Sequence, residues 1–222
     1  MYVPRHFEAS DVAWCHALIR REPFAILAAA DEAGVPFATH LPVVLDATRG
    51  PLGTLVAHVA RPNPQWRHFG PGRPVLVIFA GPHAYVSPSW YGHHPSVPTW
   101  NYVAVHAYGV PQLVEEPARV RACLERLVHL FEDGRPAPWR MDGLPAAYLE
   151  SMMRGIVAFE IPIDRLEGKA KLSQNRPADD RARVRAALAA DPEDPLGQAV
   201  AALMAEREAG ESDGGAPRDP AR

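Results

Sequence analysis

Cysteine is scarce in this chain of 222 residues. Cys15 and Cys123 are the only two, and they lie far apart in segments with helical spacing. A disulfide framework needs an even set of regularly spaced cysteines, and a cysteine zinc site needs several thiolates in short motifs. Neither pattern occurs, so we interpret both residues as small buried hydrophobes.

Long apolar runs and a large excess of one charge are also missing. No run reaches the roughly 18 residues typical of a membrane span, and the first residues, MYVPRHFEAS, lack the apolar region of a secretory signal. The 23 basic and 26 acidic residues give a net charge of −3, which provides no general attraction to DNA or anionic lipid. The sequence therefore predicts a cytoplasmic protein without a membrane partner.

Short catalytic and metal-binding motifs are absent as well. The chain has no G-x-S-x-G, Walker A, Rossmann or H-E-x-x-H pattern. His40, His58, His83 and His106 fall in strand-like segments, which leaves a metal or haem site conceivable, but no short-range ligand pair supports one. The side chains of the adjacent histidines at 93 and 94 should point in different directions. We therefore predict no catalytic residues and no metal site.

Proline and glycine, by contrast, are abundant, with 24 and 16 residues that fall mostly between apolar runs. This pattern is typical of short strands joined by turns. We expect strands at 24–30, 35–46, 52–60, 74–81, 97–116 and 156–173. Few crossover helices separate them, which favours an antiparallel barrel over a parallel sheet.

Helices are expected before the first strand and between the later strands. Ser10 is the predicted N-cap of the first helix, and Pro117 occupies the first turn of the helix that ends near residue 132. The predicted domains are a barrel at 1–176, a helical extension at 177–208 and a disordered tail at 209–222. The fold class is thus mainly β with flanking helices, an α+β arrangement.

The segment HVARPNPQW, residues 58–66, is a candidate anion site. Two prolines stiffen the turn around Arg61 and Asn63, and the planar guanidinium group suits a phosphate. In the preceding strand, Thr39 and His40 place a polar pair within an apolar run, on opposite faces. The alternative is an exposed turn with an ordinary surface arginine.

The strand VPTWNYVAVHAYG, residues 97–109, carries an unusual number of rings and amides. Tyr85, Trp90, Tyr91, Trp100 and Tyr102 could stack on a planar ligand or form a dimer interface. At the end of the last strand, Lys169 and Lys171 share one face before the amides of Gln174 and Asn175, a group suited to phosphate and heterocycle edges. The alternative here is a solvated strand end.

Six segments together resemble the PaiB-type family, described as FMN-binding negative transcriptional regulators. They are MYVPRHF, ATHLP, HVARPNPQW, VIFAGPHAYVSPSWY, VPTWNYVAVHAYG and VAFEIPIDRLEGKAKLSQNR, in this order between Met1 and about residue 190. The resemblance implies an FMN-binding split β-barrel, similar to the pyridoxamine-phosphate oxidase superfamily. It also implies a homodimer with the flavin in the groove between subunits.

The resemblance also implies candidate cofactor-binding residues. The turn at Arg61 corresponds to one that binds the FMN phosphate in oxidase relatives, and Thr39 and His40 lie on the strand beside it. The full set of expected FMN-binding residues is Thr39, His40, His58, Arg61, Asn63, Thr99, Trp100, Asn101, Lys171 and Gln174.

Promoter DNA is a further expected partner of a regulator, but the C-terminal helices supply few groups to read it. The second of them carries only Gln198 and Arg207 as base- or phosphate-binding candidates, so packing helices are the favoured interpretation. Two other hypotheses remain open. One is a flavin-dependent oxidoreductase or haem-handling enzyme on the same barrel, and the other is a ligand-free interaction protein.

Overall fold

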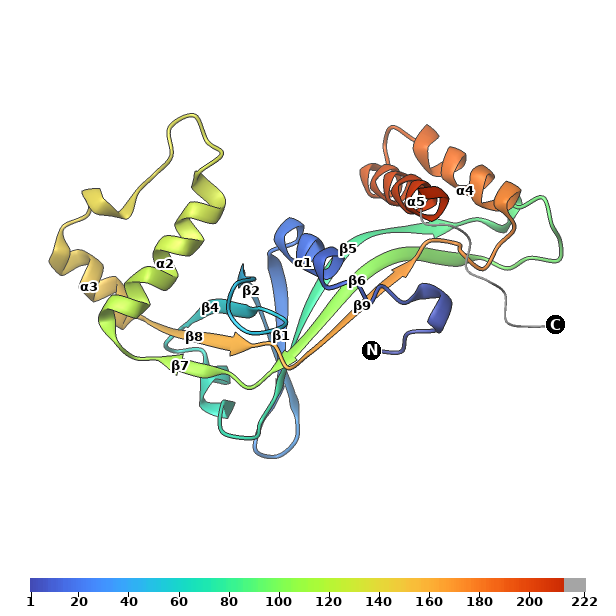
Figure 1. Cartoon of the computed structure of the whole chain (residues 1–222). Coiled ribbons are helices and arrows are strands. Elements are labelled where there is room, and N and C mark those ends of the chain that lie inside the picture. The colour runs from blue at the N-terminus through green and yellow to red at the C-terminus, as the bar shows by residue number, and fades with distance from the viewer. Residues whose placement is uncertain (214–222) are drawn as a thin grey trace. The chain divides into compact units, whose positions relative to one another are not determined.

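The computed structural model describes residues 1–213, and its strands form two antiparallel sheets. The five-stranded sheet has the order β2-β1-β5-β6-β9 and the four-stranded sheet the order β3-β4-β8-β7. The strands are β1 (Phe24–Ala30), β2 (Pro36–Pro42), β3 (Val44–Asp46), β4 (Thr54–Ala60), β5 (Val75–Val86), β6 (Thr99–Gly109), β7 (Gln112–Val114), β8 (Ile156–Pro162) and β9 (Arg165–Lys171). Figure 1 shows the course of the chain.

Five α-helices accompany the sheets and confirm the expected α+β class. They are α1 (Val12–Arg21), α2 (Pro117–Glu132), α3 (Ala146–Arg154), α4 (Ala178–Ala190) and α5 (Pro195–Asp213). Short 3-10 turns lie at η1 (Arg5–Phe7), η2 (Pro64–His68), η3 (Pro88–Trp90) and η4 (Met141–Gly143). Within residues 1–213, no helix has the length and apolar character to cross a membrane.

Residue contacts group the chain into two units. The first comprises Met1, residues 10–80 and residues 105–168; the second comprises residues 2–9, 81–104 and 169 onward. Strands β5, β6 and β9 each contribute residues to both units. The domain boundary predicted at residue 176 remains a prediction. Helix α5 extends to Asp213, so residues 209–213, which were assigned to the predicted tail, are helical. The remainder of that predicted tail lies outside the described residues.

The first unit has a core formed from both sheets. β1 and β2 pair over their full length, as do β4 and β8. The buried side chains of the core include Leu27 and Phe79 from one sheet and Leu55 and Phe159 from the other. Glu160 of β8 is also buried, and it accepts paired hydrogen bonds from the guanidinium of Arg49, at 2.8 and 2.7 Å.

Two strands expected to be continuous change sheet within the first unit. The predicted strand at 97–116 divides into β6 and β7, and the one at 156–173 divides into β8 and β9. The two corners touch, because the N–H of Asp164 donates to the carbonyl of Tyr108 at 2.9 Å. A Cβ atom on Gly109 would lie 2.1 Å from the Pro162 carbonyl oxygen, so only glycine fits at this corner.

The second unit is built around the paired helices α4 and α5, which lie side by side (Figure 1). Val184 and Leu188 of α4 and Val200 and Met204 of α5 are buried. Arg181 and Arg185 both approach Glu208, at 3.6 and 3.7 Å. These contacts agree with helices that pack against each other.

Helix starts are close to those expected. Asp11, not Ser10, caps α1: its carboxylate accepts the N–H of Ala13 at 2.9 Å. Both residue types are good N-caps, so the sequence leaves the choice between neighbours open. Pro117 begins α2 as predicted.

Candidate functional site

A small cavity in the second unit is lined by several of the predicted residues. Its volume is about 190 Å³. The lining residues come from η1, the loop before β6, β6 itself, the end of β9 and the segment after it; they are Phe7, Tyr91, Val97, Pro98, Thr99, Asn101, Lys171, Ser173, Asn175 and Arg176. Two of them are cationic and none is acidic, so we call this the basic cavity.

Lys171 is the central cation of the basic cavity. Its ammonium group donates to the hydroxyl of Thr99 at 2.6 Å and to the carbonyl of Trp100. Burial lowers the pKa of Lys171, and the positive charge of Lys169 lowers it further. The ammonium carries three donors, so one remains for an anionic ligand.

The second cation, Arg176, is held by an aromatic ring. Its guanidinium carbon lies 4.1 Å from the centroid of the Tyr91 ring, a cation–π contact, and one of its nitrogens donates to the hydroxyl of Ser96 at 3.3 Å. The stacking fixes the plane of the guanidinium and leaves part of its donor edge available.

A strained turn shapes the floor of the basic cavity. Ser173 has a φ of +65°, the left-handed conformation that side chains rarely adopt. The Gln174 side chain accepts the N–H of Leu172 at 2.7 Å and donates to the carbonyl of Ala170, which holds the turn closed. Such outliers persist where surrounding structure enforces them, and they concentrate at ligand sites.

Asn101 supports that turn from β6. It is fully buried, and its amide nitrogen donates to the hydroxyl of Ser173 at 2.9 Å. The same nitrogen lies 3.7 Å from the sulfur of Met204. The neighbouring Trp100 is 52% exposed and lies edge-on to the ring of Tyr85, with ring centroids 6.0 Å apart. This pair leaves an aromatic surface open to solvent.

The turn after β4, in the first unit, holds the other group of predicted residues. The side-chain amide of Asn63 donates to the Thr39 hydroxyl at 2.9 Å, and its oxygen accepts the N–H of Gln65. Arg61 is exposed, and its Nε and Nη2 donate to the carbonyls of Arg154 and Ile156, both at 2.7 Å. These hydrogen bonds hold the turn in place before any ligand binds. Nη1 of Arg61 takes part in neither of the two bonds to the carbonyls.

The two predicted histidines of this region lie apart from that hydrogen-bonded group. His40 is exposed on β2, 6.2 Å from the Phe24 ring. His58 lines an apolar cavity of about 520 Å³ between β4 and the helices α2 and α3, together with Leu127, Trp139 and Leu149. Burial lowers the pKa of His58, which favours a neutral ring.

Some residues of the basic cavity were not among the predicted site residues. Tyr91 was considered only as a possible stacking residue, and Ser173 and Arg176 were left out of the expected FMN-binding set. The sequence held one usable signal, which is that Ser173 and Arg176 belong to the same polar run as Lys171 and Gln174.

A family model described as "Putative FMN-binding domain" matches residues 1–165. The protein named "Protease synthase and sporulation protein PAI 2" from Bacillus subtilis is 35% identical over 207 residues, covering 93% of this chain and 98% of that protein. The chain belongs to the PaiB-type FMN-binding family. The family match confirms FMN as the expected cofactor. Another relative, the uncharacterized protein AN0679 of Emericella nidulans, is 32% identical over 219 residues, covering 82% of this chain and 87% of that protein.

Solved structures confirm the expected split-barrel fold. The flavocytochrome Anf3 from Azotobacter vinelandii has a TM-score of 0.60 at 16% identity, covering 82% of this chain and 78% of that one. The FAD and heme binding protein from Mycobacterium smegmatis has a TM-score of 0.58 at 20% identity, covering 79% and 78%. At these identities the likeness concerns the fold.

Proposed function

We propose that this protein is an FMN-binding PaiB-type regulator that works as a homodimer, with the flavin at the interface between the two copies. The observation that carries the proposal is the family match over residues 1–165, together with the similarity to PAI 2 over nearly the full length of both chains. Bound FMN would supply a redox-active ring. The protein would sense flavin occupancy or the redox state of the flavin.

The basic cavity fits the phosphate of FMN. Lys171 and Arg176 provide two positive charges, and Thr99, Ser173 and Asn175 provide uncharged polar groups, with no carboxylate in the lining. Charge-assisted hydrogen bonds of this kind favour phosphate. A volume of about 190 Å³ accommodates a phosphate and part of the ribityl chain, so the flavin ring would extend beyond the cavity.

The ring has a suitable aromatic surface in the same unit. Trp100 and Tyr85 are 52% and 47% exposed, and exposed aromatic pairs stack on planar ligands. In this arrangement Lys171 would hold the phosphate and orient the ribityl chain, and Trp100 would cover one face of the ring.

The turn at Arg61 is the other candidate for the phosphate. Thr39 and Asn63 are bonded to each other there, and Nη1 of Arg61 lies outside the two carbonyl bonds. Both positions carry a cation close to polar groups. The two candidate phosphate sites can therefore be distinguished by testing whether substitution of Lys171 or of Arg61 weakens FMN binding.

The test is a titration of FMN-free protein with FMN, followed by flavin fluorescence. Losing a charge-assisted hydrogen bond costs about 1.5–3 kcal/mol, so Lys171→Met should raise the Kd by about tenfold or more. Arg61→Ala is measured beside it, with Arg67→Ala as the matched control, because Arg67 is an exposed arginine in the same turn. Wild-type protein without saturable binding at micromolar concentration would end the proposal.

Two further measurements examine the dimer and the regulatory role. Light scattering should give twice the chain mass of 24.3 kDa, and binding to the promoter of its own gene should weaken steeply with salt. A monomer in solution with FMN bound contradicts the interface location. NAD(P)H-dependent flavin reduction above the free-FMN background, or a Soret band, would instead favour the enzyme or haem-handling hypothesis.

A further inference from the structure

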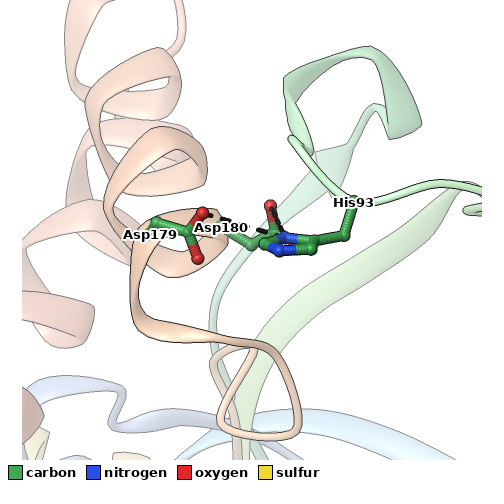
Figure 2. A group of neighbouring side chains, drawn as sticks. All are labelled: His93, Asp179 and Asp180. Atoms are coloured by element: carbon green, nitrogen blue, oxygen red, sulfur yellow. Dashed lines mark ion pairs between the residues drawn. The ribbon is translucent and has the colours of Figure 1, made fainter.

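Three side chains of the second unit form a cluster outside the lining of the basic cavity. His93 lies in the loop that follows η3, and Asp179 and Asp180 lie in the first turn of α4. Figure 2 shows the imidazole of His93 facing both carboxylates. Its Nδ1 lies 3.2 Å from Oδ1 of Asp180 and 3.8 Å from Oδ2 of Asp179.

Asp180 is the unusual member of this cluster. Its side chain is 0% exposed, and Oδ1 accepts the N–H of Gly92 at 2.7 Å. The second oxygen, Oδ2, is buried and has no hydrogen-bond partner among the described residues. Buried carboxylate oxygens are costly unless they are paired, so Oδ2 has unused acceptor capacity next to the Oδ1 atom that faces His93.

The neighbouring arginine does not fill that role. The guanidinium of Arg183 lies against the backbone of Gly92, where its carbon would be 3.1 Å from a Cβ atom on that glycine. It makes no hydrogen bond to Oδ2 of Asp180. The unpaired oxygen therefore remains even with a cation close by.

The ligand set and spacing fit a divalent transition metal. One atom each from His93, Asp179 and Asp180 lies within 4.8 Å of the others. Imidazole nitrogen and carboxylate oxygen bind Zn²⁺ at about 2.0–2.2 Å, so tetrahedral ligand atoms lie roughly 3.3–3.6 Å apart. The separations of His93 Nδ1 from Oδ1 of Asp180 and Oδ2 of Asp179, 3.2 and 3.8 Å, bracket that range, and the ligand atoms of the two carboxylates lie within 4.8 Å of each other.

We propose that His93, Asp179 and Asp180 bind one divalent transition-metal ion, such as Zn²⁺, which fastens the loop after η3 to the first turn of α4. Three protein ligands leave a fourth position for water or an external group. The N–H of Gly92 orients the Asp180 carboxylate, the role that outer hydrogen bonds have at metal sites.

Two features lower the expected affinity of this site for a metal ion. The N-terminus of α4 carries a partial positive charge, and Arg183 adds a full one nearby. Both oppose a cation, whereas the two carboxylates favour it. We therefore expect a Kd on the order of micromolar, weaker than that of closed structural zinc sites.

The test uses full-length, chelator-treated, FMN-free protein titrated with Zn²⁺ and separately with Co²⁺, whose visible absorption reports coordination. We expect one equivalent per chain for the wild type. His93→Gln and Asp179→Asn should each weaken binding at least tenfold; both side chains are more than half exposed, at 58% and 55%, so the fold should tolerate the changes. His94→Gln is the matched control and should bind as the wild type does.

A thermal unfolding measurement separates loss of a ligand from loss of the fold. Zn²⁺ should raise the Tm of the wild type and of His94→Gln, because binding to the native state stabilises it, and at the same Zn²⁺ concentration it should raise the Tm of His93→Gln clearly less. The metal-free variants should melt near the metal-free wild type. The proposal is overturned if no stoichiometric site appears below about 100 μM Zn²⁺, or if His93→Gln and Asp179→Asn bind like the wild type.

Discussion

Glu160 in the first unit and Asp180 in the second are both buried carboxylates, but their surroundings differ. Both oxygens of Glu160 are paired: Arg49 donates to each of them, and Arg119 donates to Oε2 at 3.0 Å. Asp180 accepts bonds through Oδ1 alone, and Oδ2 is left without a partner among the described residues.

Glu160 therefore has a structural role, whereas the carboxylate of Asp180 can still bind a ligand. A bidentate arginine pair satisfies a carboxylate within the chain, so Glu160 needs nothing from outside. Asp180 retains acceptor capacity in a place where water is excluded. Four predictions test this contrast.

The largest effect is expected from Glu160→Gln. The substitution leaves the shape but removes the charge that pairs with Arg49, and charged hydrogen bonds of this kind contribute about 2 kcal/mol. The Tm should fall by roughly 4–8 °C in a chain of this size. Chemical denaturation measures the change in the free energy of unfolding, and an unchanged midpoint would contradict the structural role.

The second prediction concerns the pH dependence of the same pair. The hydrogen bonds and charge of Arg49 hold the pKa of Glu160 below its ordinary value, despite the opposing effect of burial. A carboxylate with a lowered pKa in the folded state adds stability above its unfolded pKa of about 4.3, and loses it as the pH falls through the folded value. The stability difference between the wild type and Glu160→Gln should therefore be constant from pH 7 to about 5 and shrink below about 4.

The third prediction concerns Asp180→Asn, which should cost less than Glu160→Gln in metal-free protein. The asparagine oxygen can still accept the N–H of Gly92, and a neutral amide replaces an unpaired anionic oxygen. The same variant should lose the rise in Tm that Zn²⁺ gives the wild type. If Asp180→Asn proves more destabilising than Glu160→Gln in urea, the carboxylate is structural and the contrast fails.

The smallest effect is expected from Arg119→Ala. Its side chain is 54% exposed, and exposed ion pairs contribute about 0–1 kcal/mol. The free energy of unfolding should fall by about 0.5 kcal/mol, because Arg49 keeps both oxygens of Glu160 paired. A loss as large as that of Glu160→Gln would show that Arg119 is the dominant partner.

Local features of the fold could be predicted from the sequence. The apolar run at β1, the return strand at β2 and the proline that opens α2 follow from composition and spacing. The exchange of strands between sheets could not, because the breaks after Gly109 and Pro162 depend on a contact between corners that are distant in the sequence.

The candidate site shows the same limit. Lys171 and Thr99 were both among the predicted residues, and the structure brings them within 2.6 Å. Gln174 was also predicted as a ligand contact, but its side chain is bonded to the backbone of its own turn, and its role in binding remains a prediction. The cluster of His93 with Asp179 and Asp180 has no signature in the sequence, since the loop and the helix meet only on folding.

The corner at Gly109 also restricts which sequences can encode this fold. Since the Pro162 carbonyl already fills the space of a side chain there, a library randomised at that codon should return one amino acid among clones that produce folded protein. Chimeras of this gene with that of a relative that keep the Pro162 corner should fold only when they carry glycine at position 109.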